Sequence, residues 1–269
     1  SICQGQQVSI LWPLIFGSGR AIKFAYPSFK WSNLASKNAG VTVCIIGLSE
    51  THAKGRKIYS QSDAGTISVL DCDNINAYLI NGQSIEIKKS SKPISKLPTM
   101  TLGNVPYDGG NLLLSPRDLE SLSLVPEQRK RFIKRFYGSA EFIRGIERYC
   151  LWIGDNDLQD ALSEPSIAVR IEGVRQMRLG STDAGTVAMA ARPHQMREMN
   201  IGKEKTIVVP RVSSENRMFL PVGVVGNDAI IGDKNYAIYD GPIWALALLA
   251  SRLHRTWIGA VCVRLRTDF

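Results

Sequence analysis

An aromatic and basic segment joined to an apolar segment, near the start of the chain, constrains the fold most. Residues 27–33 (PSFKWSN) lead into residues 41–47 (VTVCIIG). A continuous apolar run that ends in glycine is typical of a strand buried on both faces, as in doubly wound α/β sheets. No complete βαβ half precedes this strand, and the sequence contains no glycine-rich cofactor loop. We therefore expect residues 1–60 to be the closing part of a cofactor-binding domain, and the chain to be a fragment.

Length and composition indicate a folded protein outside the membrane. The 269 residues, 44% of them hydrophobic, can bury a substantial core and can divide into two units. The longest apolar runs, residues 10–16 and 243–250, are much shorter than the about 20 residues of a membrane span, and the first residues do not resemble a signal peptide. The five cysteines are scattered singly without CxxC spacing, which argues against a disulfide framework or a zinc site. We expect a cytoplasmic protein with no membrane partner and no metal.

The formal charge of +9 and a pI near 9.4 favour a polyanionic partner, most simply nucleic acid. A basic surface that serves solubility would explain the charge equally well. The clustering of the basic residues favours nucleic acid, since arginine suits forked contacts with phosphate or guanine. The clusters are Lys23, Lys30, Lys37, Lys54, Arg56 and Lys57; Lys88, Lys89, Lys92 and Lys96; Arg129, Lys130, Arg131, Lys134 and Arg135; and Arg252, Arg255, Arg264 and Arg266.

The local patterns predict an α/β beginning followed by an α+β remainder. A helix broken near Pro13 is expected over residues 5–16, a short strand over 22–26 and the buried strand over 41–48. The turn formers of residues 104–110 demand an unusual backbone path, and Ser115 with Pro116 starts a capped helix. The other expected elements are strands at 57–59, 66–71, 149–153, 206–210, 218–225 and 236–239, a turn or short helix at 75–79, an extended connection at 88–98, helices at 126–136, 139–145, 157–162 and 165–179, and a long helix from 243 to about 254 that extends or kinks to 264.

A series of short motifs follows one order along nearly the whole chain. They are residues 1–8, 28–31 with Asn33 and 38–39, 45–47, 103–104 with Pro106 and 108–110, Phe142 with Gly145 and 148–152, 174–175, 193–194, 210–215, and 251–252 with His254 and Trp257. The series resembles the type IIL, MmeI-like restriction and modification enzymes, which are similar to other adenine-modifying DNA methyltransferases. One such motif would be weak evidence, but many in the same order are strong evidence.

This resemblance implies a domain organisation. Residues 1–60 would hold the C-terminal strands of a Rossmann-like methyltransferase sheet, residues 61–240 a mixed α+β target-recognition domain, and residues 241–269 a C-terminal helix with a base-reading segment. In the family, the cofactor loop for S-adenosylmethionine (AdoMet) and the Asn-Pro-Pro-aromatic catalytic motif lie upstream, and neither occurs here. We expect a sequence-specific recognition fragment of a bacterial adenine-N6 DNA methyltransferase, which binds no cofactor and has no catalytic residue of its own. Its partners would be double-stranded DNA and the missing N-terminal part of the same polypeptide.

Phe29 is the expected stacking residue for a flipped base. Methylation of adenine in a duplex requires the base to leave the stack at a cost of a few kcal/mol, and an aromatic face can then hold it. Phe29 lies in the segment that resembles the base-stacking block of the family, although it could instead be a core aromatic residue beside the sheet. Lys30 would contact a phosphate.

Arg266 and Asp268 are the first candidates for reading bases. The resemblance places at these positions a charged pair that discriminates one base pair of the target. A basic side chain donates to guanine and an acidic one accepts from cytosine, so this pair suits G·C. The alternative is a local ion pair, which contributes little.

A turn and a serine-rich segment supply the remaining candidates. Lys234 and Asn235 are further candidates for reading bases, because residues 232–235 would form a hairpin tip that enters a groove; the alternative is an ordinary solvated turn. Arg211, Ser213 and Ser214 are expected to contact backbone phosphates. No nucleophile elbow accompanies the serines, which disfavours a hydrolase. The other functional class is an RNA-binding or protein-interaction domain with a basic surface.

Overall fold

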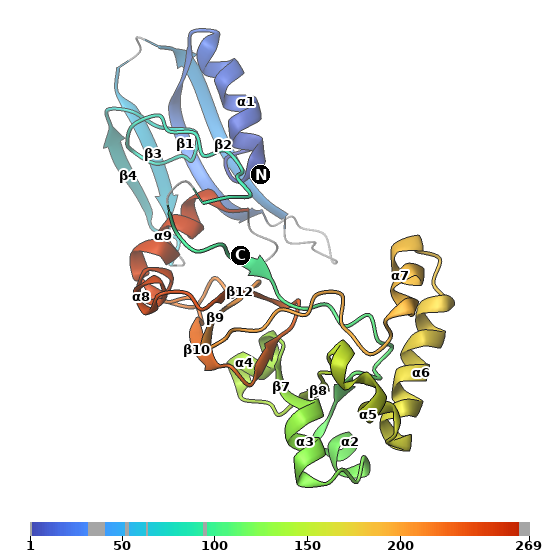
Figure 1. Cartoon of the computed structure of the whole chain (residues 1–269). Coiled ribbons are helices and arrows are strands. Elements are labelled where there is room, and N and C mark those ends of the chain that lie inside the picture. Colours follow the sequence, from blue (N-terminus) through green and yellow to red (C-terminus); the bar gives the residue numbers. More distant parts are fainter. Residues whose placement is uncertain (1, 32–40, 52–53, 63, 94–95, 264–269) are drawn as a thin grey trace. The chain divides into compact units, whose positions relative to one another are not determined.

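The computed structural model describes residues 2–31, 41–51, 54–62, 64–93 and 96–263 (Figure 1). The chain divides into two compact units. The first comprises Ser1–Lys92, Ser214–Met218 and Arg252–Phe269, and the second comprises Pro93–Ser213 and Phe219–Ser251. Within the described residues, none of the helices is both long and apolar enough to cross a membrane.

The first unit contains a four-stranded sheet with a helix against it (Figure 1). The helix α1 (Gln6–Gly17) precedes β1 (Arg20–Trp31), β2 (Val41–Glu50), β3 (Arg56–Gln61) and β4 (Ile67–Cys72), and the strand order is β2-β1-β3-β4. β1 pairs antiparallel with β2 and parallel with β3, and β4 is antiparallel to β3. The unit also includes α9 (Arg252–Val261) from the end of the chain.

The core of the first unit lies between α1 and the sheet. Val8 and Trp12 are one helical turn apart and fully buried, and they pack with Ile22 of β1 and Ile58 of β3. The expected break of the helix near Pro13 is wrong, because α1 continues through it. Trp12 on one side of the proline and Phe16 on the other, with ring centroids 5.2 Å apart, both pack on this core. Packing on this core therefore keeps the helix continuous across the proline.

Two expectations about this sheet are corrected by the structure. The predicted short strand at 22–26 is the much longer β1, which carries register shifts near Ile22 and Tyr26. The predicted burial of residues 41–48 on both faces is wrong, since β2 lies at the edge of the described sheet and is antiparallel to its neighbour. Ile45 and Leu48 are each 48% exposed there. The weak strands expected at 57–59 and 66–71 are present as β3 and β4.

The second unit contains two further four-stranded sheets. One has the order β10-β9-β12-β5 and the other β11-β7-β8-β6. Their strands are β5 (Thr101–Leu102), β6 (Leu113–Leu114), β7 (Ile133–Tyr137), β8 (Tyr149–Leu151), β9 (Lys205–Pro210), β10 (Gly223–Gly226), β11 (Ala229–Ile231) and β12 (Asn235–Tyr239). The strands from 205 onward were expected as hairpins, but β11 leaves them and pairs in parallel with β7 of the other sheet.

The helices of the second unit cover a core built around α6. Ile167, Ile171 and Val174 recur at helical spacing and are buried with Phe132 and Leu151. The helices are α2 (Pro116–Ser121), α3 (Pro126–Phe132), α4 (Ser139–Arg144), α5 (Leu158–Leu162), α6 (Pro165–Leu179), α7 (Ala184–Ala188) and α8 (Ile243–Ala250), with 3-10 turns at Asp155–Asp157 and Met189–Ala191. The prediction of α6 from residues 165–179 is confirmed.

The expected start of a helix at Ser115 is also confirmed. The Ser115 hydroxyl accepts a hydrogen bond from the Asp118 N–H, and the Asp118 carboxylate accepts one from the Ser115 N–H, which forms a capping box. Hydrogen bonds from the Ser115 side chain and backbone, aided by Arg170, lower the pKa of Asp118.

Three predicted elements of the later chain differ from the structure. The helix expected over 126–136 ends at Phe132, because residues 133–137 pair with β8 and β11 as β7. The strand expected over 218–225 is only β10. The long helix expected from 243 to about 254, with an extension or kink to 264, is divided into α8 and α9 at Ser251. The Ser251 backbone is extended, and its hydroxyl donates to the Leu248 carbonyl at 2.7 Å. The short helix α7 had no predicted counterpart.

The predicted turn at residues 104–110 follows an unusual path, with positive φ at Tyr107, Gly109 and Gly110. The fully buried guanidinium of Arg178 holds this turn. It donates to the carbonyls of Pro106, Tyr107, Met189, Arg192 and Gln195 at 2.7–3.0 Å. The Asp108 carboxylate closes the turn by accepting from the N–H groups of Leu112 and Leu113. The polar groups of this turn are therefore engaged in hydrogen bonds within the protein.

We predict that Arg178→Met lowers the free energy of unfolding by more than about 3 kcal/mol. The substitution leaves several buried carbonyls without a donor, and each such loss costs about 1–3 kcal/mol. The measurement is urea unfolding followed by circular dichroism. The control is Arg175→Met on the same helix, whose exposed guanidinium pairs with Glu172 and whose loss should cost less than about 1 kcal/mol. Equal unfolding midpoints for the two variants would contradict the prediction.

Candidate nucleic-acid interface

Two of the predicted site residues, Arg211 and Lys234, line the same pocket of the second unit. The pocket has a volume of about 600 Å³, and we call it the Arg211 pocket. Its walls come from the start of α4, from the residues after β9 and from the turn before β12. The lining residues are Ser139, Ala140, Glu141, Arg211, Val212, Lys234 and Tyr236.

The pairing of β9 with β12 brings Arg211 to Lys234. Asn235 lies opposite Pro210 in this antiparallel ladder, so the residue after β9 is adjacent to the residue before β12. The Arg211 N–H donates to the Lys234 carbonyl at 3.1 Å. The Arg211 guanidinium donates to the Asp233 carbonyl at 3.1 Å and lies 5.8 Å from the ring centroid of Tyr236. The exposed guanidinium is therefore held in place at the mouth of the pocket.

The Arg211 pocket has an exposed arginine and an exposed lysine in its lining. Lys234 is 70% exposed and forms an ion pair with Asp233 at 3.0 Å. Glu141 lies deeper, with 14% of its side chain exposed, and Arg148 is 3.2 Å from it. Arg211 forms no ion pair within the part of the chain that the structure describes. The arrangement offers an oriented guanidinium and a nearby ammonium to an anion such as a phosphate.

The turn at residues 232–235 is not a hairpin tip, and this expectation is wrong. It joins β11 to β12, which belong to different sheets, and its backbone N–H groups donate to carbonyls of Tyr137 and Asn104. Asn235 is fully buried. Its amide nitrogen donates to the Tyr137 carbonyl at 2.8 Å, and its amide oxygen accepts from the Ser139 hydroxyl at 3.1 Å. Asn235 therefore fixes the turn and cannot reach a base edge as we had expected.

The two predicted serine contacts lie in different settings. Ser213 is only 5% exposed, and its buried hydroxyl has no hydrogen-bond partner among the described residues. A phosphate cannot meet it in this conformation, so the expected contact is not supported. Ser214 is half-buried, and its hydroxyl accepts from the Asn216 N–H at 3.3 Å.

Phe29 belongs to a row of aromatic rings on the first unit. Phe24, Tyr26, Phe29 and Trp31 of β1 and Tyr59 of β3 form this aromatic row, with neighbouring ring centroids 5.3–6.4 Å apart. Ala25, between Phe24 and Tyr26, is buried in the core under α1, so the two flanking rings point to the other face of the sheet. Trp31 is 52% and Phe24 39% exposed.

Most of the residues that accompany the predicted ones were not expected from the sequence. Tyr26 and Tyr59 stack 6.3 Å apart, because β1 and β3 are parallel neighbours although they are far apart in sequence. The alternation of aromatic residues at positions 24 and 26 was an available signal for the row. Tyr236 and Glu141 of the Arg211 pocket carried no local signal.

Some predicted residues lie outside the described part of the chain. Arg266 and Asp268 fall beyond residue 263, and the side chain of Lys30 is not described although its backbone belongs to β1. No group of three acidic, histidine or cysteine side chains among the described residues could hold a metal ion.

Comparison with known proteins gives matches over the whole chain. Residues 81–269 match the family described as MmeI, target recognition domain, and residues 1–60 match MmeI, DNA-methyltransferase domain. DNA methyltransferase A of Bacillus subtilis (strain 168) is 42% identical over 270 residues, which cover 100% of this chain and 30% of that protein. The chain thus spans about a third of the length of the relatives it matches.

A solved structure matches as well. The type IIL restriction-modification enzyme MmeI, in complex with DNA, is 34% identical with a TM-score of 0.81, over 100% of this chain and 36% of that one. This match confirms the expected fold class, and the comparisons together confirm the resemblance seen in the motifs. The chain therefore belongs to the MmeI family of restriction-modification enzymes, with residues 1–60 in its DNA-methyltransferase domain and residues 81–269 in its target recognition domain.

Proposed function

We propose that this chain recognises a specific sequence in duplex DNA on behalf of a DNA methyltransferase that modifies adenine at N6. The observation that carries the proposal is the match of residues 81–269 to a target recognition domain. The similar MmeI structure was solved in complex with DNA. The activity belongs to a longer polypeptide in the bacterial cytoplasm, and this chain contributes DNA binding and sequence selection to it.

The Arg211 pocket supports the proposal through its charge and rigidity. A guanidinium fixed by a carbonyl and a tyrosine ring, with an exposed lysine beside it, suits a phosphate of the DNA backbone. Half or more of the hydrogen bonds between proteins and DNA go to phosphate and sugar, and they set the position of the protein on the duplex. Arg211 and Lys234 would therefore position the domain without reading bases.

The aromatic row supports a role in holding a displaced base. An adenine amino group inside a duplex is out of reach of a methyl donor, so the base must leave the stack. Phe29 is our proposed partner for the flipped adenine, and stacking of a base on such a ring contributes about 1–3 kcal/mol. The rings of Tyr26 and Trp31 lie beside Phe29, with centroids 5.3 and 6.3 Å from its own.

AdoMet is the cofactor that the family implies, and the described residues of the first unit do not fit it. A nucleotide-type cofactor is held where a strand passes through a glycine-rich loop into a helix. In the first unit, none of the strands β1 to β4 leads directly into a helix. We therefore derive no step through AdoMet.

Arg266 and Asp268 remain our proposed reading pair for a G·C base pair. We predict that selection from a randomised pool of DNA duplexes enriches a short motif, and that the Arg266→Ala/Asp268→Ala variant loses one position of it. A mismatch at a contacted pair typically costs about 1–3 kcal/mol, which sequencing of the retained pool detects. Enrichment of nothing, or binding to RNA in preference to duplex DNA, would contradict the proposed function.

We predict that Arg211→Gln and Lys234→Gln weaken DNA binding to a similar degree for all sequences. Each lost phosphate contact should reduce the slope of log K against log salt by about 0.9. The measurement is fluorescence anisotropy on one duplex over a series of salt concentrations. Lys203→Gln, an exposed lysine of the same unit that does not line the pocket, is the matched control. A slope that changes as much in the control as in the pocket variants would refute the assignment.

A further inference from the structure

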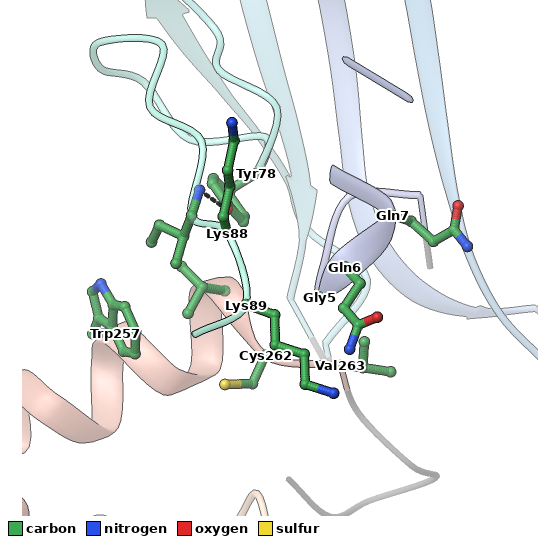
Figure 2. Close-up of a pocket in the computed structure, with 11 residues that line it drawn as sticks. Gly5, Gln6, Gln7, Tyr78, Lys88, Lys89, Trp257, Cys262 and Val263 are labelled. Carbon is green, nitrogen blue, oxygen red and sulfur yellow. Dashed lines mark hydrogen bonds between the residues drawn. The ribbon is translucent and has the colours of Figure 1, made fainter. Parts of the chain in front are cut away.

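The first unit has a pocket that none of the predicted site residues lines. Its volume is about 430 Å³, within the range of small-ligand sites, and we call it the Trp257 pocket (Figure 2). Three segments form it: the first turn of α1, the chain from Tyr78 to Lys89, and the second half of α9. All three belong to the same compact unit.

Hydrogen bonds fix the walls of the Trp257 pocket. The Tyr78 hydroxyl accepts from the Ile87 N–H at 3.0 Å and so holds the lysine-bearing segment in place (Figure 2). The Asn76 amide oxygen accepts from the N–H of Tyr78 at 3.0 Å. On the opposite wall, the Gly5 N–H donates to the Val261 carbonyl at 2.8 Å and joins α1 to α9. The cavity is therefore a built feature of this unit.

The chemistry of the lining is aromatic and cationic. Trp257 is 48% exposed although it is the largest side chain of α9, and Val261 follows one helical turn later on the same face. Lys88 and Lys89 are both exposed at the rim. None of the described residues that line the pocket is acidic. A ligand with a planar ring and an attached anionic group matches a pocket that is lined by an exposed indole and by two lysines.

We propose that the Trp257 pocket binds a nucleotide, with the base against Trp257 and the phosphate bound by the flexible side chain of Lys88 or Lys89. The nucleotide is either a free mononucleotide or an unpaired nucleotide of a DNA strand. The second source rests on the proposed function, while the first is independent of it. Lys88 and Lys89 belong to a basic cluster of the sequence that the Arg211 pocket does not use.

The test measures the affinity of the 269-residue chain for three probes. They are 2′-deoxyadenosine 5′-monophosphate, a fully paired DNA duplex, and the same duplex with one additional, unpaired deoxyadenosine. The pocket variants are Trp257→Leu and Lys88→Gln/Lys89→Gln. The matched controls are Trp244→Leu, which is equally exposed at 50% but lies on α8, and Lys92→Gln/Lys96→Gln from the same segment, neither of which lines the pocket.

We expect each pocket variant to weaken mononucleotide binding about tenfold or more, or to lower by the same factor the preference for the duplex with the unpaired nucleotide over the fully paired one. The controls should change either quantity by less than about twofold. Urea unfolding confirms that each variant is folded. If the pocket variants weaken binding of the mononucleotide alone, the ligand is a free nucleotide. If they lower the affinity for the duplex with the unpaired nucleotide, the ligand is a nucleotide of the DNA strand.

The inference is overturned if neither probe shows binding that depends on Trp257 and the two lysines. Sequence selection from fully paired duplexes is a separate measurement. If it persists in all pocket variants while nucleotide binding is absent, the inference fails and the proposed function stands. If the mononucleotide binds in the pocket but no sequence is selected, the proposed function fails and the pocket stands.

Discussion

A buried guanidinium that is bonded to carbonyls holds the second unit in shape. Arg178 presents its donors in a fixed planar fork, and five backbone carbonyls from the turn at residues 104–110 and from the segment after α7 accept from it. Burial lowers the pKa of this guanidinium, with Arg192 adding to the effect. Such a charge is costly to desolvate unless its donors are satisfied, so the two segments can occupy this conformation only together.

Buried asparagine side chains connect the turn at residues 104–110 to the Arg211 pocket. Asn104, at the start of the same turn, is fully buried and bonds to the backbone of Asn200 and of Ile231, at the end of β11. Its carbonyl accepts from the Asp233 N–H, and Asn235 anchors the other side of that turn. Lys234 is thereby left as the exposed residue between two anchored ones. Rigid support of this kind is what places a surface charge accurately enough to select one position of a phosphate.

The features that the sequence predicts well are those specified by neighbouring residues. The capping box at Ser115, the helix at Pro165–Leu179 and the turn at residues 104–110 each depend on contacts within a few positions. The features that it predicts wrongly depend on distant partners. Residues 133–137 carry a helical pattern, but pairing with β8 and β11 makes them a strand. Asn235 is of a residue type that is common in solvated turns. It is buried, however, and bonds to Tyr137 and Ser139, which lie almost a hundred positions earlier in the sequence.

The same distinction limits what net charge can say about function. The cluster Arg129–Arg135 appears in the sequence as a footprint for a polyanion, yet two of its arginines are engaged within the protein. Arg131 bonds to Asp157 at 2.5 Å and to Asp160 at 2.7 Å, and Arg135 lies 3.4 Å from Glu147 and against the rings of Tyr137 and Tyr149. Arg211 and the two lysines of the Trp257 pocket, in contrast, are exposed cations in concave surroundings. An exposed cation in a hollow that forms no ion pair with the described residues, such as Arg211, differs from one already engaged by a protein carboxylate, and only the folded arrangement reveals which case applies.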